Sequence, residues 1–219
     1  PTNAFAGVEG WADGKGGAAS PRDFIPTVSD EEAYIARYTI SVDLDGGGWI
    51  GTNFTISNLG LGDGHGAAKV RIELPERKGR YTYSQKVDRD EWSSKSSTLD
   101  LEIASVRLTA KDTRHFSVRF DDPDSEVKME LNFVNSLPMY RPGNGRIDVE
   151  DGYFAYAMLA PRASVSGRVF IDGKWRDVSS SGDAFADHTA TNIAPFNFAK
   201  RFSRFRSYED DLTVSWREV

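Results

Sequence analysis

The sequence predicts an all-β protein in which antiparallel strands form a barrel or a strongly curved sheet, with one short helix near the C-terminus. Apolar and polar residues alternate with a period of two over most of the chain, and clusters of Gly, Asp, Asn and Pro separate these segments. This spacing is typical of an antiparallel meander, a barrel or a sandwich. Because each strand then has one apolar face, the sheet must fold over that face, and closure into a barrel removes exposed edges.

About nine or ten short strands are expected after an irregular N-terminal segment. Residues 1–30 are rich in Gly and Pro and contain few apolar residues, which indicates loops. The alternating segments cover residues 34–44, 50–56, 70–74, 81–83, 99–108, 116–120, 127–133, 153–159, 165–171 and 212–216. Asp45 and the three glycines after it separate the first two segments, because such residues tolerate the positive φ of a hairpin loop.

The predicted helix spans residues 196–208. Phe198, Phe202 and Phe205 follow an i, i+4, i+7 spacing, which places them on one helical face. Four cations accompany them: Lys200, Arg201, Arg204 and Arg206. The helix either caps one end of the barrel or contacts an anionic surface or ligand head group.

Composition excludes several classes of protein. The 219 residues have a formal net charge of −6 and include no cysteine, so disulfides, thiolate nucleophiles and Cys-containing zinc sites are excluded. A chain of this length builds one large core or at most two small ones. No apolar run reaches the ~18–20 residues of a membrane-spanning helix. The acidic balance argues against nucleic-acid binding, which depends on excess positive charge.

The first residue gives the only indication of location. The chain opens with Pro1 rather than Met, so either a leader was removed or the chain was trimmed. The residues that follow are ordinary for a mature sequence after a small-residue cleavage site, which favours a periplasmic or secreted protein.

Aromatic residues dominate the predicted inward face of the barrel. They are Tyr34, Tyr38, Phe54, Phe116, Phe120 and Phe133. A barrel of eight or more strands can enclose a small ligand, so these rings either fill the interior or line a pocket. We predict a ligand site formed by Tyr38, Phe54, Phe116, Phe133 and Tyr156, with Arg204 and Arg206 near an anionic head group.

Asp187 and His188 are the candidate catalytic residues. A carboxylate beside an imidazole at a barrel mouth can act as a general acid/base pair, although an Asp in such a turn can equally cap the backbone. The three histidines do not have metal-ligand spacing, and the glycine-rich segment 60–66 leads into a strand rather than the helix of a phosphate site. We therefore predict neither a metal nor another cofactor.

Two segments resemble a known family. The stretches EEAYIARYTISVDLDGGGWIGTNFTISN (31–58) and GDAFADHTATNIAPFNFAKRFSRFRSY (182–208) are similar to the two-domain lipocalin-like (calycin) superfamily. This superfamily includes yeast survival-factor proteins, AttH-like proteins and carotenoid (hydroxyneurosporene) hydratases. The resemblance implies an irregular segment at 1–30, one lipocalin-like barrel at 31–208, and a linker or first strand of a missing second barrel at 209–219. It also implies a second barrel domain or a homodimer as a partner.

Three functions follow from these observations. The first is binding or transport of a hydrophobic ligand, which the resemblance identifies as a lipid or isoprenoid. The second is a hydratase, cyclase or hydrolase acting on an apolar substrate, with Asp187 as the general acid that the hydratase branch implies. The third is a structural half-domain that a partner barrel completes.

Overall fold

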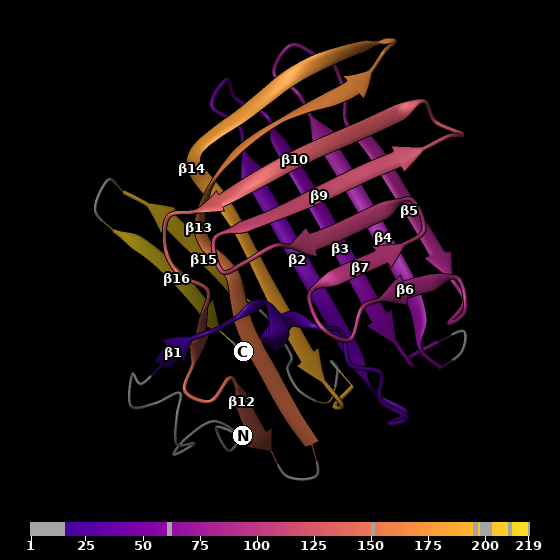
Figure 1. Cartoon of the computed structure of the whole chain (residues 1–219), viewed down its shortest axis with the longest axis vertical. Coiled ribbons are helices and arrows are strands. Elements are labelled where there is room, and N and C mark those ends of the chain that lie inside the picture. The colour runs from indigo at the N-terminus through magenta and orange to yellow at the C-terminus, as the bar shows by residue number, and fades with distance from the viewer. Residues whose placement is uncertain are drawn as a thin grey trace.

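The strands curl into a nearly closed antiparallel barrel, seen from the side in Figure 1. The computed structural model describes residues 16–60, 63–149, 152–194, 197, 203–209 and 212–218. Fourteen strands belong to one sheet, whose main path runs β5-β4-β3-β2-β14-β13-β10-β9-β8-β7-β6. The sequence-based expectation of an all-β antiparallel barrel is confirmed.

The elements follow one another in chain order as alternating strands. They are β1 (Gly16–Ala18), the 3-10 turn η1 (Pro21–Phe24), β2 (Ile35–Asp43), β3 (Trp49–Ser57), β4 (His65–Glu73), β5 (Tyr81–Val87), β6 (Trp92–Ser94), β7 (Asp100–Ile103), β8 (Val106–Ala110), β9 (His115–Asp122), β10 (Val127–Asn135), β11 (Tyr140–Pro142), β12 (Arg146–Val149), β13 (Gly152–Ile171), β14 (Lys174–Thr191), β15 (Ser203–Tyr208) and β16 (Thr213–Glu218). Residues 16–30 of the expected irregular segment therefore include β1 and η1.

Side chains bridge the two ends of the curled sheet. The indole Nε1 of Trp92 in β6 donates to the Gly64 carbonyl oxygen, at 2.7 Å, beside the start of β4. The rings of Tyr83 in β5 and Phe120 in β9 lie with their centroids 4.8 Å apart. These contacts link β5 and the start of β4, at one end of the sheet, to β9 and β6 near its other end, whereas no backbone ladder pairs β5 with β6.

The long hairpin of β13 and β14 reaches beyond the barrel at the lower end of Figure 1. Residues 163–170 of β13 pair with β10, whereas its first half pairs with β11 and β12 instead. The pairing of β13 with β14 shifts register between Met158 and Val165. Pro161 lies in this stretch and has no N–H to donate to a ladder, which favours such an irregularity. The bend lets one hairpin serve both the barrel wall and an extension below it.

The interior of the barrel is filled with aromatic rings. All six aromatic residues predicted to face inward are buried: Tyr34, Tyr38, Phe54, Phe116, Phe120 and Phe133. Phe54 has no exposed area, and Tyr38 is 1% exposed. A water-sized space beside either ring would expose part of it, so the rings pack directly against other protein atoms.

The 3-10 turn η1 (Pro21–Phe24) closes the lower end of the interior, and we refer to it as the plug. Phe24 at the end of η1 is fully buried, and its carbonyl oxygen accepts a hydrogen bond from the Tyr38 hydroxyl at 2.8 Å. η1 begins after Ser20, whose backbone N–H donates to the Asp23 carboxylate at 2.7 Å. This contact satisfies a donor that a helix start would leave unpaired. The plug thus separates the ring-filled interior from the space below it.

The predicted helix at 196–208 is wrong over its second half. Ser203–Tyr208 form strand β15, which pairs with β16 as an antiparallel hairpin; residues 195, 196 and 198–202 lie outside the described part. The segment Ser203–Tyr208 also has a period of two, because Arg204 and Arg206 share one face while Phe205 points the other way. Within the described ranges, no helix is long and apolar enough to cross a membrane.

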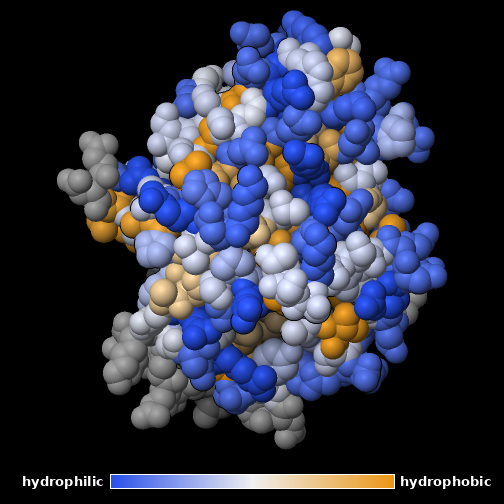
Figure 2. All heavy atoms as spheres, viewed as in Figure 1, coloured by the Kyte–Doolittle hydropathy of each residue, from blue (hydrophilic) through white to orange (hydrophobic). Residues whose placement is uncertain are grey.

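The hairpin β15–β16 presents apolar side chains to solvent. Phe205 and Leu212 are 55% and 57% exposed, and Val214 is 38% exposed. Figure 2 shows apolar atoms at this hairpin on the left of the view. The proposed second barrel domain or homodimer partner, together with the boundaries 1–30, 31–208 and 209–219, stays a prediction.

Candidate functional site

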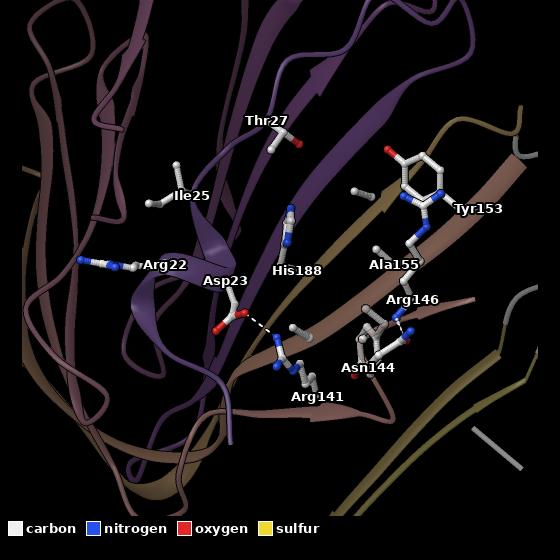
Figure 3. A pocket seen from close by; sticks show the side chains of 14 residues that line it. Arg22, Asp23, Ile25, Thr27, Arg141, Asn144, Arg146, Tyr153, Ala155 and His188 are labelled. Atoms are coloured by element: carbon white, nitrogen blue, oxygen red, sulfur yellow. Dashed lines mark hydrogen bonds and ion pairs between the residues drawn. The ribbon is translucent and has the colours of Figure 1, made fainter. Parts of the chain in front are cut away.

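A cavity of about 330 Å³ lies below the plug, between η1, the β11–β12 turn and the extended β13–β14 hairpin (Figure 3). We refer to it as the end cavity. Its lining includes Arg22, Ile25, Arg141, Arg146, Tyr153 and His188. Figure 3 shows Asp23 of η1 meeting Arg141 of β11, whereas the Arg22 side chain points away from His188, Arg146 and Tyr153.

Small side chains on β13 and β14 make room for this cavity. Ala155 pairs with Ala190 across the two strands, and Ala157 pairs with His188. Residues opposite each other in an antiparallel pair share one face of the sheet. This face continues the ring-filled inner face of the barrel, but here it presents methyl groups in place of rings.

His188 forms the boundary between the interior and the end cavity. Its imidazole stacks on Tyr38 with ring centroids 4.3 Å apart and meets the edge of Phe24 at 6.3 Å. The side chain is nine-tenths buried, and its Nε2 has no hydrogen-bond partner among the described residues. Desolvation by burial lowers the pKa of His188 to about 4, so the imidazole is neutral at physiological pH.

Charged side chains hold the outer wall of the cavity. Asp23 accepts a hydrogen bond from Arg141 at 2.6 Å while it also caps η1, which ties β11 to the plug. Arg146 donates to Asp148 at 2.7 Å and lies 4.0 Å from the ring centroid of Tyr153. Gly145 forms the turn before Arg146 with a φ of +83°, in the region that favours glycine.

Arg22 differs from the other two arginines of the lining. Within residues 16–60, 63–149 and 152–194, its guanidinium has no recorded hydrogen bond or ion pair, and it is exposed. The lining therefore contains three guanidinium groups and one carboxylate. Arg141 is paired with Asp23 and Arg146 with Asp148, so these two charges of the cavity wall are balanced by carboxylates.

Asp187 lies on the opposite face of β14 from His188. Successive residues of a strand point to opposite faces, and the register pairs Asp187 with Thr39 while His188 pairs with Tyr38. The Asp187 carboxylate is buried under the β15–β16 hairpin, 3.7 Å from Nη1 of Arg204. The structure does not bring the two predicted catalytic side chains together, so the adjacent acid/base pair expected from the sequence is not formed.

The other predicted site residues are spread over four places. Tyr156 belongs to the lining of the end cavity, and Tyr38 lies directly behind His188. Phe54 is inside the filled interior. Phe116 and Phe133 stack on each other at 4.2 Å and border a separate depression of about 390 Å³ over β8, β9 and β10.

Arg204 and Arg206 lie outside the barrel. Arg206 covers the ring of Phe185 at 3.8 Å, and Arg204 faces Asp187, so both fasten the β15–β16 hairpin to the outer face of β14. The cations that line the end cavity are instead Arg22, Arg141 and Arg146, which sequence reasoning missed. Their one local signal is the Arg-Pro-Gly-Asn-Gly-Arg segment at 141–146, whose turn residues predict two arginines flanking a tight turn.

Comparison with solved structures identifies the fold. An AttH protein from Nitrosomonas europaea superposes with a TM-score of 0.56 at 16% identity, over 78% of this chain and 54% of that one. The fold is a lipocalin-like barrel. Kievitone hydratase from Nectria haematococca is also similar, with a TM-score of 0.46 at 10% identity, over 77% of this chain and 52% of that one. No family model and no curated protein sequence matches the chain.

The likeness to AttH concerns the fold alone. The chain spans about half the length of each of these two structures. The lipocalin-like barrel explains why the strands close around an apolar interior. The end cavity is described from the residues of this chain and not from the comparison. No group of three or more His, Cys, Asp or Glu is arranged to hold a metal ion in the part of the chain that the structure describes.

Proposed function

We propose that this chain binds a small hydrophobic molecule of the lipid or isoprenoid class in the end cavity. The observation that carries the proposal is the end cavity itself, a space of about 330 Å³ that His188 and the small side chains of β13 and β14 line.

The size and chemistry of the cavity support the same proposal. Its volume of about 330 Å³ is at the lower end of the range typical for small-molecule pockets. The methyl groups of Ala155, Ala157 and Ala190 and the side chain of Ile25 provide apolar wall. Each methylene buried there would contribute about 0.8 kcal/mol before the costs of association.

The filled interior favours this location over the centre of the barrel. Tyr38 and Phe54 were predicted as ligand contacts, but both are packed against protein, with at most 1% of their area exposed. The position of Asp187 does not favour the enzymatic alternative. Its side chain faces the β15–β16 hairpin, whereas a general acid must come within hydrogen-bond reach of its substrate.

Uptake of a neutral fluorescent probe, N-phenyl-1-naphthylamine, tests the proposal. We expect saturable binding by the unmodified chain and loss of binding in Ala155→Phe, which places a ring in the cavity. Ala67→Phe on β4 is the matched control, because Ala67 is also a half-buried strand alanine but lies away from the cavity. Equal binding by both variants, or no uptake and no lipid recovered by solvent extraction and mass spectrometry, would contradict the proposal.

A further inference from the structure

Strand β5 is the last strand at one end of the sheet, and one of its edges is open. Its residues pair with β4 from Ile72 to Gly66 without a bulge, and no strand of the described part pairs with its other edge. Figure 1 shows β5 at the right margin of the sheet. Half of the backbone N–H and C=O groups of an edge strand point away from its partner, so this edge is a template for another strand.

The contacts that β5 makes across the opening of the barrel come from its inner face. The rings of Tyr81 and Tyr83 lie with their centroids 6.2 and 4.8 Å from that of Phe120. On the outer face, Ser84 and Lys86 are exposed. Edge strands are commonly protected by proline, bulges or several charges, whereas β5 contains no proline, no bulge and one charged residue. The backbone of this edge is therefore open to an extended partner.

Exposed charges of opposite sign lie at the two ends of β5. Arg80 comes directly before the strand and Lys78 lies two residues earlier, while Asp88 and Asp90 follow the strand. The Nε of Arg80 donates to Glu73 of its own chain, and its Nη groups have no hydrogen-bond partner within the described residues. In an antiparallel pair of two identical strands, the basic end of one lies opposite the acidic end of the other, whereas parallel pairing brings like charges together.

We propose that β5 pairs antiparallel with β5 of a second copy of this chain, in a symmetric dimer whose two-fold axis passes Ser84. In this register Arg80 of each copy lies opposite Asp88 of the other, and the ion pair occurs twice because the interface is isologous. Lys86 lies opposite Thr82, so no like charges face each other within the strands. The sheet then continues from one copy into the next through main-chain hydrogen bonds.

The charges and the strand length select this register among its neighbours. The inner and outer faces stay in phase only when the register shifts by two residues. Such a shift in either direction shortens the paired stretch, and in one direction it places Arg80 opposite Lys86. The inference goes beyond the proposed function, because no residue of β5 lines the end cavity.

Cysteine cross-linking tests the register, because the chain has no cysteine of its own. In Ser84→Cys the two thiols meet at the two-fold axis, where opposite Cβ atoms are about 4.5–5.5 Å apart. Mild oxidation should therefore give a disulfide-linked dimer on a non-reducing gel. Thr82→Cys places its two thiols about 13 Å apart in the same dimer and should stay monomeric. Ser166→Cys, an exposed strand serine on β13, is the second control. Equal cross-linking of all three variants would contradict the proposed register.

Sedimentation velocity over a range of concentrations measures the dimer itself. We expect a monomer–dimer equilibrium for the unmodified chain, weakened at least about tenfold in Arg80→Glu and in Asp88→Arg, each of which places like charges opposite each other. An equimolar mixture of these two variants should restore the dimer, because every basic position of one then meets an acidic position of the other. Recovery in the mixture also requires both variants to be folded.

Charge reversals elsewhere on the surface are the matched controls. Arg114→Glu and Asp30→Arg change exposed residues away from β5 and should leave the equilibrium unchanged. A chain that stays monomeric at millimolar concentration overturns the proposal. A dimer that the reversals at Arg80 and Asp88 leave intact places the interface elsewhere, and weakening without recovery in the mixture equally contradicts the pairing of β5 with β5.

Discussion

The ring-filled interior and the end cavity lie on the same face of β13 and β14, yet one is closed and the other open. On one side of His188, Tyr38 and Phe54 leave no room for a water molecule. On the other side, Ala155 and Ala190 face each other and the wall recedes. The difference shows that closing a barrel does not by itself create a ligand site. The volumes of the side chains along a strand decide where the space lies.

The largest expected effect on stability comes from removing a ring from the filled interior. Phe54→Ala removes a fully buried ring, and we expect a loss of about 4 kcal/mol in the free energy of unfolding, measured by urea titration. Binding of the neutral probe in the end cavity should stay within about twofold of the unmodified chain. New uptake of the probe by Phe54→Ala would mean that the interior and the end cavity form one space, contrary to the comparison.

His188, which lies at the boundary between the two regions, should make the free energy of unfolding depend on pH. The pKa of His188 is about 4 in the native state against 6.5 for an ordinary histidine. Between these values the unfolded chain binds a proton that the native chain does not, so stability is complete above pH 6.5 and falls as the pH drops towards 4. We expect this group to account for about 3 kcal/mol of that loss.

Urea unfolding at pH 7, 5.5 and 4 measures the effect. In His188→Gln the same series should show a flatter dependence, whatever the variant's stability at pH 7. Parallel curves for the two proteins would show that the imidazole is not desolvated, and with it the argument for a buried polar group in the cavity wall would fail.

A smaller effect is expected on the outer face of β14. Asp187→Asn leaves Arg204 without its charge partner, but Arg204 is 37% exposed and water compensates in part. We therefore expect a loss of about 1–2 kcal/mol in unfolding free energy and no change in ligand affinity. Asp112→Asn, which removes an exposed charge partner of His115, is the control and should leave the unfolding free energy unchanged within the error of the measurement. Loss of binding with unchanged stability in Asp187→Asn would instead mean that Asp187 contacts the ligand, contrary to its position on the outer face of β14.

The sequence predicts the barrel because alternation records which face of each strand is buried. It identifies the inward rings correctly, from Tyr34 to Phe133, since each lies in phase with its neighbours. Alternation also implies that Asp187 and His188 point to opposite faces, a consequence available from the sequence once both are assigned to a strand rather than to a turn. The pattern contains no information about which neighbouring strand leaves space.

The end cavity depends on contacts between distant segments, and those contacts were beyond sequence reasoning. Arg22 comes from a segment expected to be irregular, and Arg141 reaches it only because Asp23 holds both η1 and β11. The helical spacing of Phe198, Phe202 and Phe205 competed with the period of two at 203–208, and pairing with β16 decided for a strand. The secondary structure of this segment therefore depends on tertiary pairing, which local residue spacing does not indicate.

The smallest expected effect on stability concerns a charge pair at the rim of the end cavity. Asp148 pairs with Arg146 at the surface, and both side chains are more than half exposed, so Asp148→Asn should change unfolding free energy by less than about 0.5 kcal/mol. The same change releases Arg146 and raises the positive potential of the cavity rim. We expect the anionic probe decanoate to bind about two- to threefold more tightly by calorimetry, while decan-1-ol, a neutral probe with the same alkyl chain, is unaffected. Asp121→Asn, which releases Lys128 elsewhere on the surface, should alter neither affinity. An equal gain for both probes would mean that the substitution acts on the apolar wall rather than on charge.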